Sequence, residues 1–153
     1  MTTGFRNLTL YKKAFALAMD TYHVSKKFPN DELYSLTTQI RKSSRSVCSN
    51  IGEGYRKRLY EAHFISKISD SDMENTETQV WLNFALSCEY ISKKSFDDFN
   101  NRSEEIARLI SHIPDKSGLK GINSPVFRLP TVDCRLNNTK YIEIEHNYAR
   151  NTV

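Results

Sequence analysis

Hydrophobic residues recur at helical spacing in four successive segments of this chain, and only short breaks separate the segments. The segments run over residues 8–27, 33–58, 60–91 and 95–113. Pro29 and Pro114 follow the first and the fourth, and proline cannot continue a helix. The fourth helix is predicted to begin at Ser95, which forms a capping-box-like pair with Asp98. Because short connections force neighbouring helices to run antiparallel, the pattern predicts an all-α, up-and-down four-helix bundle.

The first two segments each carry one apolar stripe, which we expect to face the core. In the first segment the stripe consists of Tyr11, Phe15, Ala18 and Tyr22. In the second it consists of Leu36, Ile40, Val47 and Ile51. Ser43 and Ser44 fill the gap in the second stripe, where small side chains would permit close approach of another helix.

The third segment is apolar on two sides. One stripe consists of Phe64, Ile68, Leu82 and Leu86. The other consists of Met73, Val80, Phe84 and Ile91, with Trp81 beside it. A helix that is apolar on two sides is expected to be buried on two sides, so the second stripe predicts a homo-oligomer interface. The alternative is a wide core face with a few exposed apolar residues.

The composition changes after Pro114. Residues 115–153 contain glycine, proline, asparagine and threonine without a helical period. Residues 141–145 alternate like a short strand, but a single isolated strand is not stable. We therefore expect a bundle over residues 1–114, followed by an irregular tail over 115–153 that is either disordered or docked on a bundle surface, its own or a neighbour's.

The charges are unevenly distributed. Residues 1–60 hold eleven Lys and Arg against four Asp and Glu, whereas residues 61–115 hold five against eleven. Such asymmetry is typical of a charged surface that faces a partner. The second helix supplies most of a basic face, to which the first helix adds two lysines; the residues are Lys12, Lys13, Arg41, Lys42, Arg45, Arg56, Lys57 and Arg58. This face predicts binding to the phosphates of RNA or DNA, and Tyr55 and Tyr60 could add base stacking. Docking of an acidic protein, or a merely solvated face, are the alternatives.

A glycine-containing motif stands in the second helix and consists of Ser49, Asn50, Ile51, Gly52, Glu53 and Gly54. It lacks the GxxxxGK[ST] pattern and falls within a helix, so it is not a phosphate-binding loop. Because glycine destabilises a helix relative to alanine, we expect the two glycines to serve close helix contact or to loosen the helix end. Asn50 and Glu53 are expected to satisfy groups on the facing helix.

Residues that would indicate catalysis or metal binding are sparse. The three cysteines form no CxxC pair, and the four histidines stand far apart without metal-ligand spacing. A magnesium site of the kind in helical pyrophosphohydrolases is conceivable, but the paired ExxE motifs that it needs on adjacent helices are missing; its carboxylates would be Asp70, Glu74 and Glu77 with Asp97 or Glu104. We expect no enzymatic activity, no cofactor and no metal. With no apolar run of about 20 residues and no signal peptide, a cytoplasmic protein is expected.

Several motifs resemble those of one known family. They comprise Phe5-Arg6-Asn7-Leu8, Tyr11-Lys12-Lys13-Ala14, Phe28-Pro29, the segment Leu36 to Ser43, the motif at 49–54, and Glu74, Glu77-Thr78 and Trp81-Leu82. The chain is similar to the bacterial four-helix-bundle proteins associated with intervening sequences in large-subunit ribosomal RNA genes, which are related to accessory proteins of diversity-generating retroelements. The resemblance implies a ring-like homo-oligomer, typically a pentamer, with a basic surface and nucleic-acid binding without catalysis. It also implies a reverse transcriptase or another acidic protein as a candidate partner. Gly52 stands where this family usually has alanine.

Overall fold

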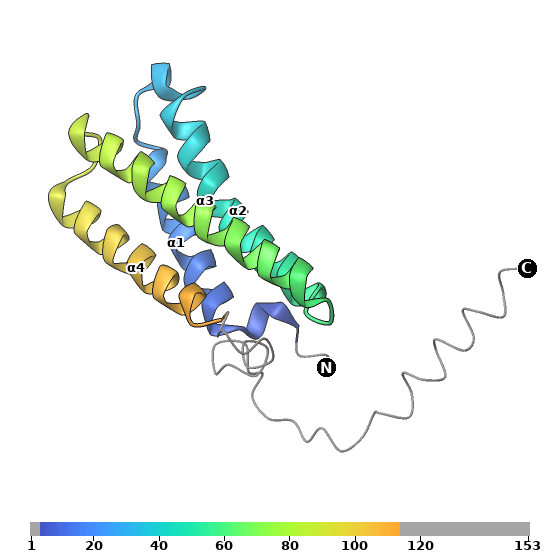
Figure 1. The fold of residues 1–153 in the computed structure, drawn as a ribbon. Helices are drawn as coiled ribbons and strands as arrows, with labels where there is room; N and C mark the ends of the chain where they lie inside the picture. The colour runs from blue at the N-terminus through green and yellow to red at the C-terminus, as the bar shows by residue number, and fades with distance from the viewer. Residues whose placement is uncertain (1–3, 114–153) are drawn as a thin grey trace, which may run out of the picture.

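The structure, a computed structural model, describes residues 4–113, which form four α-helices and two short 3-10 helices without strands (Figure 1). The elements are η1 (Phe5–Asn7), α1 (Thr9–Ser25), η2 (Asn30–Glu32), α2 (Leu36–Arg56), α3 (Glu61–Ser87) and α4 (Lys93–Ser111). Each α-helix packs against the next, and α4 packs back against α1. The predicted all-α, up-and-down four-helix bundle is confirmed. The tail predicted for residues 115–153 lies outside the described residues.

Two helices begin at other positions than predicted. Helix α2 begins at Leu36 because the carboxylate of Glu32 accepts hydrogen bonds from the Leu36 N–H (3.3 Å) and from the Ser35 hydroxyl. Helix α4 begins at Lys93, two residues before the predicted start. Its N-cap is the preceding residue, Ser92, whose hydroxyl accepts a hydrogen bond from the Ser95 N–H (3.2 Å). In both cases a side-chain oxygen satisfies a backbone donor that the first helical turn leaves open.

Helix α3 ends earlier than the hydrophobic pattern indicates. It stops at Ser87, and Glu89 adopts the left-handed conformation (φ 61°) that commonly terminates helices. The N–H groups of Tyr90 and Ile91 then donate to the carbonyl of Ala85. This reversal turns Ile91 into the core, so the prediction that Ile91 shares the outer apolar stripe of α3 is wrong.

The buried face of α1 is also rotated relative to the predicted stripe. Its buried residues are Leu10, Ala14, Leu17, Ala18, Thr21 and Ser25. Of the predicted stripe only Ala18 is buried, whereas Tyr11 and Tyr22 are half-buried and Phe15 is 50% exposed. For α2 the prediction is confirmed, because all four stripe residues and both serines in the gap are buried.

Small polar side chains connect the helices inside the core. The Thr78 hydroxyl donates to that of Ser43 (2.9 Å), and the Ser71 hydroxyl donates to the carbonyl of Val47 (3.2 Å). These contacts fit the close approach of α2 and α3. Within residues 4–113, no helix is both long and apolar enough to cross a bilayer.

Candidate nucleic-acid interface

The outer face of α2 carries cations that its neighbours do not neutralise. Arg41, Lys42, Arg45 and Arg56 lie away from the buried stripe of the helix, and no ion pair within residues 4–113 involves any of them. Glu53 is the single acidic residue of α2, and its carboxylate is bound by a lysine of α3. Lys42 interacts electrostatically with Glu74 of α3, so the positive charge of the α2 face is carried mainly by Arg41, Arg45 and Arg56.

Three cations gather around one aromatic ring where α1 meets α2. The Lys26 Nζ lies 4.6 Å from the centroid of the Tyr22 ring, and the Cζ atoms of Arg41 and Arg45 lie at 5.1 and 5.5 Å. Nε of Arg41 also donates to the hydroxyl of Ser25 (2.7 Å). The face of the ring offsets part of the mutual repulsion of the cations. The guanidinium groups are thus held in place, with the planar donor geometry that suits phosphate oxygens.

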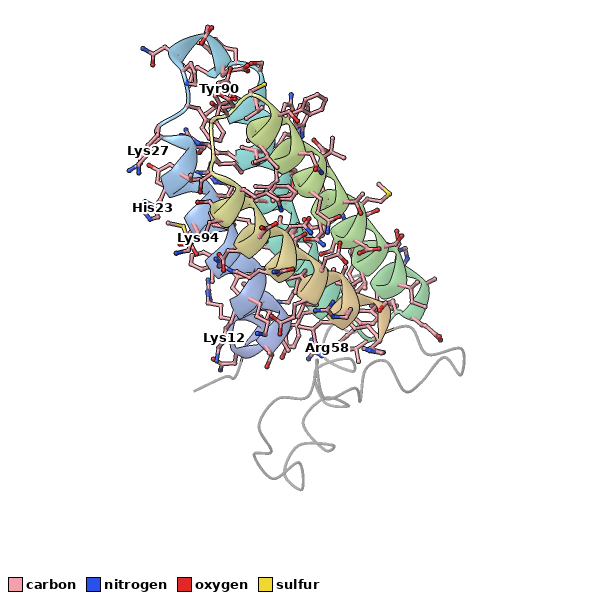
Figure 2. All side chains as sticks on the ribbon, turned by 90° about the vertical axis from the view of Figure 1, so that its left-hand side faces the viewer. Lys12, His23, Lys27, Arg58, Tyr90 and Lys94 are labelled. Atoms are coloured by element: carbon pink, nitrogen blue, oxygen red, sulfur yellow. The ribbon has the colours of Figure 1, made fainter. Side chains whose placement is uncertain are left out.

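The remaining predicted basic residues do not all join this face. Lys13 forms an ion pair with Glu105 of α4 (3.0 Å), which places it on the opposite side of α1. Arg58 donates to the carbonyl of Tyr55 (2.7 Å) and lies over the Tyr55 ring, 4.3 Å from its centroid. Lys57 is exposed. Lys12 is exposed as well and lies toward the same end of the bundle as Arg58 (Figure 2).

The aromatic residues beside the basic face differ from those predicted. Tyr55 is buried, so its ring cannot stack on a base, whereas Tyr60 is exposed and contacts the ring of His63. The rings on the α2 side of the bundle surface come instead from η1 and α1; they are Phe5, Tyr11, Phe15 and Tyr22. Three of these rings, Tyr11, Phe15 and Tyr22, were recognised in the sequence as part of one helical stripe, but that stripe was expected to face the core.

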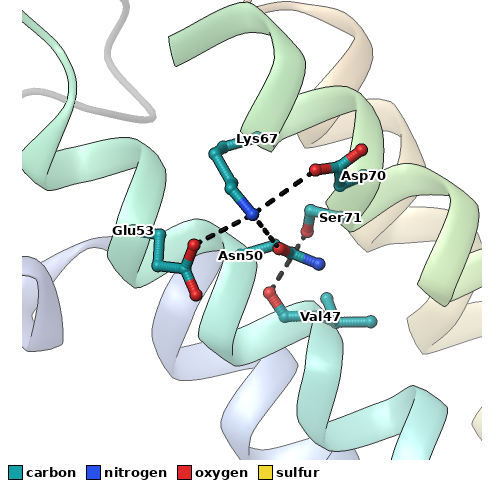
Figure 3. Close-up of polar contacts among 6 residues, drawn as sticks. All are labelled: Val47, Asn50, Glu53, Lys67, Asp70 and Ser71. Carbon is teal, nitrogen blue, oxygen red and sulfur yellow. Dashed lines mark hydrogen bonds and ion pairs between the residues drawn. The ribbon is translucent and has the colours of Figure 1, made fainter. Parts of the chain in front are cut away.

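Side chains of the glycine-containing motif on α2 contact the facing helix α3 (Figure 3). Nζ of Lys67 lies 2.9 Å from a carboxylate oxygen of Glu53 and 3.5 Å from one of Asp70, and it donates to Oδ1 of Asn50 (3.3 Å). The hydrogen bond from Lys67 lowers the pKa of Glu53, and the same contact raises the pKa of Lys67. The expected contacts of Asn50 and Glu53 with the facing helix are present.

The two glycines of the motif have different surroundings. A Cβ atom on Gly54 would lie 3.3 Å from Cδ1 of Ile68 on α3, which is a tight contact. A Cβ atom on Gly52 would lie 3.5 Å from the Phe5 ring, an ordinary van der Waals distance. Close helix packing therefore explains Gly54, whereas Gly52 faces η1.

Four of the five carboxylates considered for a metal site have other partners; one of the four, Glu104, accepts a hydrogen bond from the Gln79 amide (2.9 Å). Asp70 pairs with Lys67 and Asp97 with Lys93, while Glu77 accepts a hydrogen bond from the Trp81 indole N–H (2.9 Å). Within the described part of the chain, no three His, Cys, Asp or Glu side chains lie close enough together to hold a metal ion.

Burial raises the pKa of the Cys48 thiol to about 11, which keeps it protonated at neutral pH.

The outer face of α3 is apolar and open to solvent. Met73 is 65% exposed, Val80 is 45% exposed and Phe84 is 52% exposed. Trp81 is half-buried, and its ring centroid lies 5.7 Å from that of Phe84. We refer to these four residues as the α3 apolar face.

Comparison with known proteins identifies the family. The sequence profile of the 23S rRNA-intervening sequence proteins matches residues 6–112, a range that includes all four helices. The chain belongs to this family. It is also similar to a crystal structure of a protein of unknown function from the S23 ribosomal protein family of Bacteroides thetaiotaomicron, with 28% sequence identity and a TM-score of 0.62. That match covers 68% of this chain and 93% of the other. No curated protein is significantly similar to the chain.

Proposed function

We propose that this member of the 23S rRNA-intervening sequence protein family is a non-enzymatic homo-oligomer that binds nucleic acid in the cytoplasm, contacting the phosphate backbone along the outer face of α2. The observation that carries the proposal is that, within residues 4–113, none of the four α2 cations forms an ion pair. Their arrangement supports backbone contacts, which are independent of sequence and common to RNA and DNA. The family's link to ribosomal RNA genes is consistent with such a ligand.

The α3 apolar face supports self-association. Met73, Val80 and Phe84 are large apolar side chains exposed along one outer face of a helix whose other sides pack against α2 and α4. Exposed apolar side chains that share a face in this way are typical of an interface. In a ring-like oligomer, for which a pentamer is the family expectation, each subunit would repeat the basic face of α2. Weak phosphate contacts on several subunits would then add through multivalency.

Light scattering tests the oligomer. The wild type should exceed the monomer mass of 17.7 kDa at micromolar concentration, and Phe84→Asp should reduce the mass to that of the monomer. Because Phe84 is half-exposed, the helical circular dichroism spectrum should be unchanged. A wild-type protein that is monomeric at micromolar concentration would refute self-association.

Fluorescence anisotropy with labelled RNA and DNA tests the basic face. The double variant Arg41→Gln/Arg45→Gln should weaken binding about equally for different sequences. It should also flatten the dependence of log K on log salt by about 0.7–0.9 for each phosphate that the variant no longer neutralises. The matched control, Lys93→Gln/Lys94→Gln, removes the same charge from α4 and should bind nearly as tightly as the wild type.

Three outcomes would count against this interpretation. If the wild type binds no nucleic acid at about 50 mM salt, the proposal fails. If both double variants weaken binding equally, only net charge matters and the α2 face is not the site. If Arg41→Gln/Arg45→Gln changes the oligomer mass, the basic face contacts an acidic surface of a neighbouring subunit, and the alternative of a protein-interaction scaffold is favoured.

A further inference from the structure

A row of aromatic side chains runs along η1 and α1 beside the basic face of α2. The rings of Phe5 and Tyr11 meet edge to face, with centroids 4.9 Å apart. Those of Tyr11 and Phe15 are stacked, with centroids 6.0 Å apart and an interplanar angle of 20°. Tyr22, two turns further along α1, holds the cluster of three cations described above. Phe15 leaves half of its surface exposed and lies outside the buried core.

A concave pocket lies where this aromatic row meets the C-terminal half of α2. Its volume is about 340 Å³, near the lower end of the range of about 300–1,000 Å³ typical of small-ligand sites. It is lined by Phe5, Tyr11, Cys48, Ser49, Gly52, Glu53 and Arg56. The lining thus combines two rings, a hydroxyl and a cation, while the carboxylate of Glu53 is engaged by Lys67.

The aromatic and basic rows are parallel and extended. Arg41 and Arg56 are 15 residues apart on one helix, which separates them by about 22 Å along its axis. The rings follow the same line, from Tyr22 on the antiparallel helix α1 to Phe5 on η1. A surface of this length, with cations along one side and aromatic rings along the other, can hold several linked nucleotides. Cations already lie over the rings of Tyr22 and Phe5, so the half-exposed Phe15 offers the most open stacking surface.

We propose that this surface, which consists of the pocket and the aromatic and basic rows that extend from it and which we call the α1–α2 groove, binds single-stranded nucleic acid. Bases would stack on Phe15 and enter the Phe5–Tyr11 pocket, and phosphates would lie along the arginines of α2. This inference rests on the proposed function and specifies its ligand. In a duplex the base faces are covered by neighbouring bases, so only an unpaired strand can use the aromatic row. Cations alone would bind both forms.

Anisotropy measurements with a labelled 15-nucleotide oligo(U), an oligo(dT) of the same length and a blunt duplex test this proposal. Phe15→Ala should weaken binding of the single strands by about fivefold or more and leave binding of the duplex unchanged. Phe15→Trp, which restores a stacking surface, should keep wild-type affinity for the single strands. The control Tyr34→Ala removes an 89% exposed aromatic residue outside the groove and should change neither affinity.

The outcomes separate this inference from the proposed function. If Phe15→Ala leaves single-strand binding unchanged, or weakens all ligands equally, while Arg41→Gln/Arg45→Gln still weakens binding, the stacking proposal is wrong and phosphate binding stands. If the wild type binds none of the three ligands at about 50 mM salt, both fail. If Phe15→Ala changes the mass measured by light scattering, the groove is a contact between copies of the chain, and the single-strand proposal is overturned.

Discussion

Replacement of Ser103 by alanine should destabilise the bundle, because it leaves the buried side-chain oxygen of Asn75 on α3 without its hydrogen-bond donor. The Ser103 hydroxyl of α4 donates to Oδ1 of Asn75 on α3 (2.9 Å), and Nδ2 of Asn75 donates to the Ser103 carbonyl (3.0 Å). Both side chains are buried. In the variant, Oδ1 of Asn75 keeps no donor and is closed to solvent. An acceptor buried in this way costs about 1–3 kcal/mol, a large part of the roughly 5–15 kcal/mol by which domains are stable.

Urea denaturation followed by circular dichroism measures this free energy of unfolding. All variants are compared at one protein concentration, because self-association makes apparent stability concentration-dependent. The control is Ser69→Ala on the exposed side of α3, which carries the same change in helix propensity and should be neutral or slightly stabilising. In thermal unfolding, the difference between Ser103→Ala and the control should be roughly 4–8 °C per kcal/mol for a bundle of this size.

A double variant tests whether the Ser103 hydroxyl and the Asn75 amide stabilise the bundle as a pair. Asn75→Leu/Ser103→Ala removes the amide and the hydroxyl together, so neither position keeps a buried side-chain acceptor, and the double variant should recover much of the stability that Ser103→Ala loses. If Ser103→Ala unfolds at the same urea concentration as Ser69→Ala, the hydroxyl does not support the Asn75 amide. If Ser103→Ala and Asn75→Leu, each made alone, cause losses that simply add in the double variant, the two side chains are not coupled.

Two further predictions concern the glycine-containing motif. Gly52→Ala should raise the free energy of unfolding by up to about 1 kcal/mol through helix propensity. Gly54→Ala should raise it less, or lower it, because Ile68 must shift to make room for the added methyl group. Urea denaturation measures both variants, and equal effects would contradict the close packing at Gly54. Lys67 lowers the pKa of Glu53, so the ion pair stabilises the folded state fully above the usual glutamate value of 4.5, and this contribution is lost as pH falls through the lowered value. Glu53→Gln should therefore be less stable than the wild type at pH 7, with the difference shrinking at acidic pH, and a difference independent of pH would refute the ion pair.

The sequence by itself determined the number of helices, their order and their antiparallel arrangement, because these follow from hydrophobic periodicity and short connections. It also predicted the buried stripe of α2 and the second, outward apolar side of α3. Both are local patterns within a single helix, in which core positions and outer positions differ clearly in polarity. The contacts of Asn50 and Glu53 with the facing helix were likewise predictable, since polar side chains beside a buried stripe need partners.

Only the tertiary structure decided which side of α1 faces the core. The buried stripe and the aromatic stripe lie side by side on that helix and are both apolar, so periodicity alone favours the larger rings of Tyr11 and Phe15. The smaller side chains of Leu10, Ala14 and Leu17 fill the space between the packed helices instead. The rings of Tyr11 and Phe15 therefore lie at the edge of the core, beside α2.

The tertiary structure also decides which basic side chains of the candidate interface form ion pairs. Lys13 and the α2 cations look alike in sequence, but Lys13 meets Glu105 across the α1–α4 contact, whereas Arg45 and Arg56 meet no carboxylate within residues 4–113. Whether a cation is neutralised is set by residues far away along the chain, which only helix packing brings close. The sequence therefore determines how much positive charge α2 carries, and the packing of the four helices decides which of the basic side chains keep it.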